Sequence, residues 1–392
     1  MIYDPYSRPF QEDPYPLYRH FRDEEPCAYN AKMDFYALFR FEDVWQATLD
    51  WETYSSSLGP SLENRTLPGD MFSIIGMDPP RHVRVRNLLS KGFTPRRIAA
   101  LEPEIRRIAK RYLDPVGGRG RRFDFQAALS NKLPMDVISA LLGIPEEDRD
   151  RYRGWVERGL ERDPETGLPP AEGIEGMRKG GALMRELLAA RRKRPENDLM
   201  SLLAESSYED VDGRTKALTD DEAVAFMGLL AAAGAETTTK LLGNCVVYIA
   251  RHPDQRRRLW DDPSLMPQAI EEVLRYDAPS QFQGRVALRE ATVHGVRIPK
   301  GARVALVSGA ACRDEREFPD PERFDISRRP PRQIYFGYGN HVCIGKSLAR
   351  LEARVVLEEI RERFPDYEVD ESGLTRTYQA HVRGFKVVPI AT

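Results

Sequence analysis

The sequence FGYGNHVCIG, Phe336–Gly345, places three glycines, a histidine and a cysteine within ten residues, directly before a long stretch of helical periodicity. Glycine adopts positive φ at no steric cost and lets the backbone approach a flat ligand closely. Because Cys343 stands where the next helix is expected to begin, free N–H groups and the positive helix end would favour its thiolate. The loop therefore predicts either a buried, inert cysteine, the commonest fate of a free thiol, or a thiolate that holds a metal.

Two other uses of this loop are excluded by spacing. Gly337 and Gly339 are followed by Val342, where the dinucleotide motif G-x-G-x-x-G requires its third glycine. The chain also has no C-x-x-C pair, so neither a zinc knuckle nor a disulfide framework is indicated. The four cysteines are widely spaced, at Cys27, Cys245, Cys312 and Cys343.

Composition indicates a single globular domain. The 392 residues are 31% charged and 41% apolar, with a net charge of -2 that gives no basis for nucleic-acid binding. No Gly/Ser linker, low-complexity segment or repeat divides the chain, so residues 1–392 are predicted to form one domain. The longest apolar run, 223–235, is shorter than the ~18 residues that a spanning helix needs. With no signal-peptide pattern either, we expect a cytoplasmic protein without a membrane anchor.

Helix signals dominate the chain. Thr94-Pro95 is typical of an N-cap followed by proline at the first helical position, and predicts a helix to about Leu113. Thr219 and Glu222 form a capping box that opens a long apolar helix. The main later helices are predicted over 219–251, from 267 to before Pro279, and over 345–364.

Strand signals are short and concentrate late in the chain. They are predicted at 285–290, 291–299, 302–309 and 385–390. Many helices followed by a small sheet indicate an α-rich α+β fold, rather than the alternating order of a doubly wound sheet.

The cysteine loop resembles, position by position, the signature FGxGxHxCxG of the cytochrome P-450 family in its soluble bacterial class. The resemblance implies the single-domain P-450 fold and makes Cys343 the proximal thiolate ligand of haem b, iron protoporphyrin IX. Such a ligand pushes electron density to the iron and favours O–O cleavage. Phe336 would pack beside the sulfur, and Gly337 and Gly345 would let the backbone lie against the porphyrin. The matching residues are Phe336, Gly337, Gly339, His341, Cys343 and Gly345.

The segment GLLAAAGAETTT, 228–239, is similar to the distal-helix motif of the same family. Without the resemblance it could be a core helix with small residues for close packing, although that does not explain the acid and the threonines. The resemblance implies that Ala233 and Gly234 leave room for O2 over the iron. Thr237 and Glu236 would relay the protons that O–O cleavage consumes.

Glu272 and Arg275 lie three residues apart and share one helix face. Alone, such a pair is most often a surface pair that contributes ~0.2–0.5 kcal/mol. The resemblance implies instead that the pair is buried behind the cysteine loop. There it would be joined by Arg323, from the Pro-Glu-Arg-Phe segment 321–324.

Four residues are expected to bind the haem propionates, which need cationic or hydrogen-bonding partners. His82 and Arg86 lie one helical turn apart and resemble the HxxxR pair of the family. Arg285 and His341 match its later propionate partners. Taken singly, each is more often a surface residue, but the coincidence of all four favours a shared anionic ligand.

The function implied is a haem-thiolate monooxygenase that inserts one oxygen atom from O2 into a hydrophobic small molecule. No flavin-binding or ferredoxin-like segment is found, so electrons are expected from a separate ferredoxin or flavodoxin with its reductase. The protein is expected to be a monomer. Partner contacts are predicted near Cys343, at Arg84, Arg86, Lys346 and Arg350. Substrate contacts are predicted at Leu229, Leu230, Ala233, Gln281, Phe282 and Ala380.

Two alternatives stay open on the sequence. A peroxide-using peroxygenase or isomerase would have the same fold, but peroxide-using relatives often lack the acid–alcohol pair of Glu236 and Thr237. A haem-based gas sensor or electron carrier would leave that pair without a role, and nothing resembling an output domain is found. Turnover with hydrogen peroxide, compared with a ferredoxin system, would distinguish them.

Overall fold

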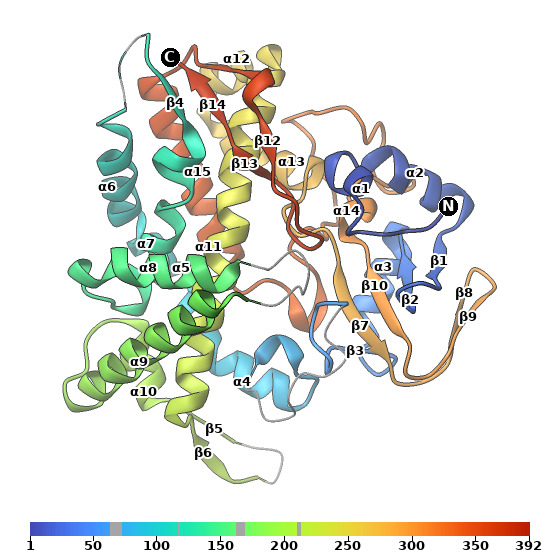
Figure 1. The fold of residues 1–392 in the computed structure, drawn as a ribbon, viewed down its shortest axis with the longest axis horizontal. Helices are drawn as coiled ribbons and strands as arrows, with labels where there is room; N and C mark the ends of the chain where they lie inside the picture. Colours follow the sequence, from blue (N-terminus) through green and yellow to red (C-terminus); the bar gives the residue numbers. More distant parts are fainter. Residues whose placement is uncertain (63–72, 117, 119, 162–168, 210–212) are drawn as a thin grey trace.

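The computed structural model describes residues 1–62, 73–116, 118, 120–161, 169–209 and 213–392. Figure 1 shows a helical region built around the long α11 (Asp220–Arg251), beside a β-rich region that contains the N-terminus. This arrangement confirms the predicted α-rich α+β fold. The cysteine loop, η5 (Gly339–His341) and its flanks, leads directly into α15 (Lys346–Arg363).

The central helix α11 begins and ends where the sequence predicts. Its capping box is complete, because Glu222 N donates to Thr219 Oγ1 at 3.2 Å and Thr219 N donates to the Glu222 carboxylate at 2.9 Å. It ends at Arg251, just before α12 (Pro253–Asp261). Three helices pack along it: α7 (Leu133–Leu142), α9 (Ala171–Lys193) and α15.

A five-stranded sheet, in the order β1-β2-β10-β7-β3, joins strands within residues 27–55 to strands within residues 283–306. Strand β2 (Phe35–Leu38) pairs in parallel with β10 (Arg303–Leu306), and Phe35 lies opposite Arg303. The prediction that strands concentrate late in the chain missed β1 (Cys27–Asn30) and β2. Each has only four residues, so no periodicity distinguishes it, and β2 also depends on pairing with a strand more than 260 residues away.

One predicted helix is two. Thr94 does cap a helix, since its hydroxyl accepts a hydrogen bond from Arg97 N at 3.4 Å. That helix, α5, covers Pro95–Ala100 only, and α6 covers Glu102–Leu113. Pro103, in the first turn of α6, has no N–H to continue the hydrogen-bond ladder of α5, so the chain breaks there.

The helix over Met266–Tyr276, α13, agrees with its prediction. The remaining helices are α1 (Arg8–Glu12), α2 (Tyr15–Glu24), α3 (Phe41–Leu49), α4 (Arg81–Ser90), α8 (Glu146–Leu160), α10 (Leu199–Glu205) and α14 (Ser308–Ala311). The remaining strands are β3 (Tyr54–Ser55), β4 (Arg122–Asp124), β5 (Ser207–Glu209), β6 (Thr215–Ala217), β7 (Gln283–Ala287), β8 (Ala291–Val293), β9 (Val296–Ile298), β11 (Glu368–Val369), β12 (Thr375–Arg376), β13 (Phe385–Val387) and β14 (Pro389–Ala391).

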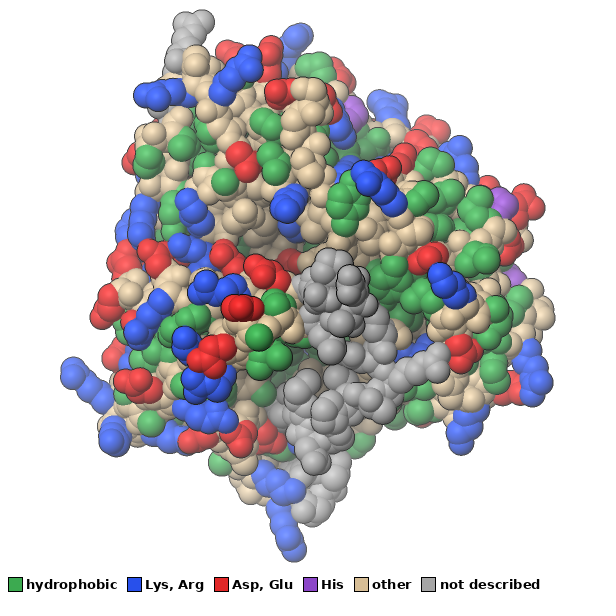
Figure 2. Space-filling model, viewed as in Figure 1, with side chains coloured by type: hydrophobic (Ala, Val, Ile, Leu, Met, Phe, Trp, Pro, Cys, Tyr) green, Lys and Arg blue, Asp and Glu red, His purple; other side chains and the backbone are tan. Residues whose placement is uncertain are grey.

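The buried apolar side chains of the described residues form two hydrophobic clusters. The larger fills the helical region, and the smaller is an aromatic cluster between the N-terminal helices and the sheet, where Phe21 stacks on Phe39 at 4.6 Å between ring centroids. On the face drawn in Figure 2, basic and acidic side chains lie interspersed. Within the described ranges, every helix is too short or too polar to cross a bilayer.

Candidate functional site

The cysteine loop is a tight turn that depends on its glycines. Gly337 and Gly339 both have positive φ, at 69° and 64°. A Cβ at Gly339 would lie 3.0 Å from the carbonyl oxygen of Thr48, which follows from the close packing of α3 on the loop. Cys343 N donates to Phe336 O at 2.8 Å and closes the turn. The backbone thus fixes where the thiol of Cys343 points.

Among the four cysteines, Cys343 is exposed and the other three are buried. Although its thiol is accessible, enough protein surrounds it that desolvation raises its pKa. The N–H of Gly345 and the charge of Arg86 oppose this shift without cancelling it. The backbone N–H of Gly345, at the start of α15, does favour the thiolate as predicted, but desolvation outweighs its effect on the pKa. A bound metal cation would favour the thiolate.

Two histidines, the buried His82 and the half-buried His341 of this loop, pack against each other. His82, from α4, is 1% exposed, and its ring lies 4.2 Å from that of His341. Within the described residues, neither ring nitrogen of His82 has a hydrogen-bond partner, and neither has Nε2 of His341. Burial lowers the pKa of His82 to about 4 and that of His341 to about 3. Buried polar atoms without partners call for an explanation, such as a ligand, an ion or a water molecule that pairs with them.

Two arginines lie close to the His82–His341 pair and the cysteine loop. Arg86 donates to the carbonyl oxygen of Val342, next to Cys343. Arg285, on β7, is 7% exposed and donates to Gly284 O at 2.7 Å, and burial lowers its pKa to about 10. Neither arginine forms an ion pair with a carboxylate of the described residues. Both charges, with His82, lower the pKa of His341, so the four groups converge from α4, β7 and the loop.

This donor set fits a flat ligand that carries carboxylates and a metal. Two arginines without a carboxylate ion pair among the described residues and two histidines supply N–H groups for anions, and the accessible sulfur of Cys343 lies close to Arg86. The predicted propionate partners His82, Arg86, Arg285 and His341 are thus brought together, although they come from three distant segments. The residues present therefore fit haem.

The predicted distal residues lie on one continuous stretch of α11. Thr237 Oγ1 donates to Ala233 O at 2.8 Å, one turn earlier in the helix. Ala233 is exposed, whereas Gly234, Glu236 and Thr237 are half-buried. Of the predicted substrate contacts on this helix, Ala233 offers the most surface, Leu229 is half-buried, and Leu230 is only 8% exposed.

The Glu272–Arg275 pair is buried and bidentate, not a surface pair. Both side chains are 1% exposed, and both hydrogen bonds measure 2.8 Å. Arg275 also donates to the carbonyl oxygens of Cys312 at 3.1 Å and Pro321 at 2.9 Å. The pair therefore ties α13 to the chain segments that precede the cysteine loop.

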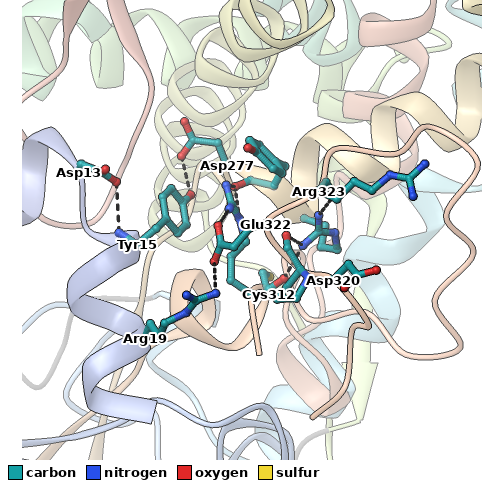
Figure 3. A network of polar contacts seen from close by, with 12 residues as sticks. Asp13, Tyr15, Arg19, Asp277, Cys312, Asp320, Glu322 and Arg323 are labelled. Atoms are coloured by element: carbon teal, nitrogen blue, oxygen red, sulfur yellow. Dashed lines mark hydrogen bonds and ion pairs between the residues drawn. The ribbon is translucent and has the colours of Figure 1, made fainter. Parts of the chain in front are cut away.

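The prediction that the Arg323 side chain joins the Glu272–Arg275 pair is wrong. Its side chain is exposed and points away from the cluster in Figure 3, and only its carbonyl oxygen accepts from Arg275, at 3.4 Å. Arg328 takes its place, with Nε 3.3 Å from a Glu272 carboxylate oxygen. Its guanidinium is held there by the carbonyl oxygens of Asp320 and Arg323. No local pattern distinguishes the two arginines, because both lie in an irregular segment.

Two predicted substrate residues are also wrong. Phe282 is 0% exposed and belongs to the N-terminal aromatic cluster. Gln281 is 4% exposed and is hydrogen-bonded to Tyr18 at 3.0 Å and to the Ala278 carbonyl at 2.7 Å. Ala380 packs against the same cluster and is only partly buried. The N-terminal segment, whose position the sequence did not predict, covers this turn.

Sequence reasoning also missed Asp277, which lies just after α13 and is completely buried. Its carboxylate accepts from the hydroxyls of Tyr15 at 2.6 Å and Tyr248 at 2.7 Å. Arg376 and Arg383 each donate to it at 2.8 Å. Figure 3 shows Tyr15 reaching toward Asp277 from the N-terminal helix. The cluster therefore joins α2, α11 and the C-terminal segment. No sequence pattern around Asp277 predicts that it is buried at the centre of this cluster.

The comparisons with known proteins agree with this geometry. The family model described as cytochrome P-450 matches residues 182–372. Cytochrome P-450 123 of Mycobacterium tuberculosis is 41% identical over 399 residues, which cover 100% of this chain and 97% of the relative. The vitamin D(3) 25-hydroxylase of Pseudonocardia autotrophica is 36% identical, with 99% and 96% covered.

A solved structure gives the same result. CYP109E1 from Bacillus megaterium in complex with corticosterone superposes with a TM-score of 0.88 at 31% identity, covering 98% of this chain and 99% of that one. Fold, loop and sequence similarity over the whole length agree. The chain therefore belongs to the cytochrome P-450 family, whose members bind haem, and is a haem monooxygenase.

Proposed function

We propose that Cys343 is the axial thiolate ligand of the haem iron and that His82, Arg86, Arg285 and His341 bind the propionates. The observation that carries this proposal is the set of buried nitrogens without partners around an accessible cysteine. Phe336, whose carbonyl accepts from Cys343 N at 2.8 Å, would lie beside the sulfur. The remaining residues proposed to lie along the porphyrin are Gly337, Gly345, Ala233 and Gly234.

The axial ligand is tested by the absorption spectrum of the reduced protein with carbon monoxide. The wild type is expected to give the red-shifted Soret band of thiolate-ligated haem, and Cys343→His the band of histidine ligation. Cys245→Ser, at a buried cysteine, is the matched control and should keep the thiolate spectrum. If the wild type already has a histidine-type spectrum, the assignment of Cys343 fails.

Proton delivery is proposed for Glu236 and Thr237. Bound haem supplies the activation of O2 from which one oxygen atom is inserted into the substrate. The Thr237 hydroxyl donates to Ala233 O at 2.8 Å, so it must exchange this bond to donate toward the ligand side of the helix. The half-buried Glu236 carboxylate, next to it in the chain, can reload the hydroxyl with a proton from water.

The substrate is proposed to be a hydrophobic small molecule. Ala233 and Leu229 offer apolar surface on α11, and relatives with similar sequence or fold include a vitamin D(3) hydroxylase and a corticosterone complex. The test is a shift of the haem spin state on titration with steroids, terpenes and fatty acids. A panel in which only polar compounds shift the spin state would overturn the proposal.

Electrons are proposed to come from a separate ferredoxin or flavodoxin that docks near Cys343. Of the predicted contacts, Arg350 is neutralised by a bidentate pair with Glu271, at 2.5 and 2.8 Å, and Arg84 donates to Glu209 O at 2.9 Å. Lys346 is the first residue of α15 and is in no ion pair of the described residues, so it leads the proposed contacts. We also propose a monomer in the cytoplasm, with residues 1–392 as one domain.

Docking is tested by reconstitution with a ferredoxin system. Lys346→Glu should raise the KM for an acidic ferredoxin and weaken the salt dependence, since electrostatic steering acts on association. Lys300→Glu, an exposed lysine beside β9, is the control and should change neither. Full turnover with hydrogen peroxide and none with either electron carrier would favour the peroxygenase alternative. No turnover with any of them would favour a haem sensor.

A further inference from the structure

A buried lysine lies one turn beyond the acid–alcohol pair of α11. Lys240 follows Glu236 by four residues and Thr237 by three, which places all three on one side of the helix. Only 9% of Lys240 is exposed. A lysine is rarely buried to this degree unless it is paired.

The position of Lys240 is fixed by the C-terminal segment. A Cβ at Gly384 would lie 2.6 Å from Lys240 Cβ and 2.9 Å from its Cγ and Cδ, so the aliphatic stem packs directly on this backbone. Gly384 immediately precedes β13. The close approach requires a glycine at 384, and it fixes the aliphatic stem of Lys240 against this backbone.

Two charged groups act on Lys240. Desolvation lowers its pKa, the carboxylate of Glu236 opposes this effect, and Lys386 on β13 adds to it. Glu236 lies N-terminal to Lys240 at i,i+4, the more favourable order of such a pair in a helix. No contact ion pair joins them among the described residues, so the attraction acts through space. An apolar side chain could fill the same volume without the cost of burying a charge.

We propose that Lys240 is a positioning residue for proton delivery, whose ammonium, held by the stem contact with Gly384, keeps the Glu236 carboxylate oriented beside Thr237. The inference rests on the proposed role of Glu236. Attraction from the C-terminal side biases the flexible glutamate toward the turn that holds Thr237. Without that cation, the carboxylate is free to turn to solvent and the relay is interrupted.

The electrostatic coupling is tested first, in the haem-loaded protein, without reference to turnover. Lysines are carbon-13 methylated, and the resonance of Lys240 is assigned by its loss in Lys240→Met. Glu236→Gln should lower the titration midpoint of Lys240 by about 0.5–1 pH unit, a ~3- to 10-fold change in proton affinity. Lys386→Met should raise it. An unchanged midpoint in Glu236→Gln would overturn the inference.

The consequence for the reaction is tested by hydrogen peroxide released per NADH consumed. Lys240→Met should increase this leakage by on the order of 3-fold or more, Lys240→Arg should restore coupling in part, and Lys386→Met should leave it unchanged. The carbon monoxide spectrum of each variant confirms an intact haem site. If Glu236→Gln does not raise leakage, the proposed relay fails. If Glu236→Gln raises it and Lys240→Met does not, only the inference about Lys240 fails.

Discussion

Two buried polar regions of this protein differ in one respect. Around Asp277, four side chains donate to one carboxylate at 2.6 to 2.8 Å. Around Cys343, the nitrogens of His82 and Nε2 of His341 lie buried without hydrogen-bond partners among the described residues. Both regions join segments that are distant in sequence, and both are rich in arginine.

This difference distinguishes a cluster that stabilises the fold, around Asp277, from the site proposed to bind haem, around Cys343. A buried polar group that is fully hydrogen-bonded needs nothing more, whereas each unsatisfied donor costs about 1–3 kcal/mol until a ligand pairs with it. The Glu272–Arg275 pair belongs with Asp277 on this criterion, since its bonds are bidentate and internal. Substitutions in these two hydrogen-bonded clusters should therefore change stability, and substitutions around Cys343 should change haem retention.

The largest effect is expected for Arg275→Ala, which removes the bidentate partner of the buried Glu272 carboxylate and leaves Arg328 as its remaining ion-pair partner. The free energy of unfolding should fall by about 3–5 kcal/mol, measured by chemical denaturation of the haem-loaded protein. Arg323→Ala is the matched control and should cost less than ~0.5 kcal/mol, because that side chain is exposed. Equal losses in the two variants would contradict the replacement of Arg323 by Arg328.

Asp277→Asn is expected to lower the free energy of unfolding by a smaller amount, about 2–3 kcal/mol at neutral pH. Burial alone would raise the pKa of Asp277, but Arg383, Arg376 and the two tyrosine hydroxyls outweigh it and hold the pKa well below 3.8. The carboxylate therefore stabilises the fold fully above its unfolded pKa, and this contribution is lost as the pH falls below that value.

Urea unfolding of wild type and Asp277→Asn at several pH values checks the sign. The difference between the two proteins should be constant from neutral pH down to about 4, near the unfolded value, and should shrink in more acidic solution. A difference that grows on acidification would contradict the depressed pKa.

His82→Leu tests the other side of the comparison. It removes two buried nitrogens that have no internal partner, so the change in the free energy of unfolding apart from haem should be at most about 1 kcal/mol. Haem transfer to apomyoglobin should instead become ~10-fold faster. His252→Leu is the control, because His252 Nδ1 already contacts Tyr248 O at 2.8 Å, and it should leave haem transfer unchanged.

The smallest change in stability is expected for Thr237→Ala, below ~0.5 kcal/mol, since its hydroxyl bonds only to its own helix. Peroxide released per NADH should nevertheless rise. Thr239→Ala is the matched control: its hydroxyl donates to Ser130 O at 2.8 Å in the interior, so stability should fall while coupling is kept. If Thr237→Ala released no more peroxide per NADH than the wild type, Thr237 would have no role in proton delivery.

The sequence by itself determined what depends on local rules. The glycines at 337 and 339 adopt positive φ, the Thr219 capping box opens α11, and Glu272 and Arg275 meet at i,i+3. The family signature around Cys343 also predicted the fold and the cofactor, because a haem thiolate constrains many neighbouring positions at once.

Only the tertiary structure decided what depends on distant contacts. It pairs β2 with β10, covers Gln281 and Phe282 with the N-terminal segment, and places Arg328 rather than Arg323 on Glu272. It also raises the pKa of Cys343, because desolvation outweighs the N–H of Gly345 and the nearby cationic side chains. Strand pairing, burial and desolvation are properties of neighbours in space, and a local sequence pattern does not contain them.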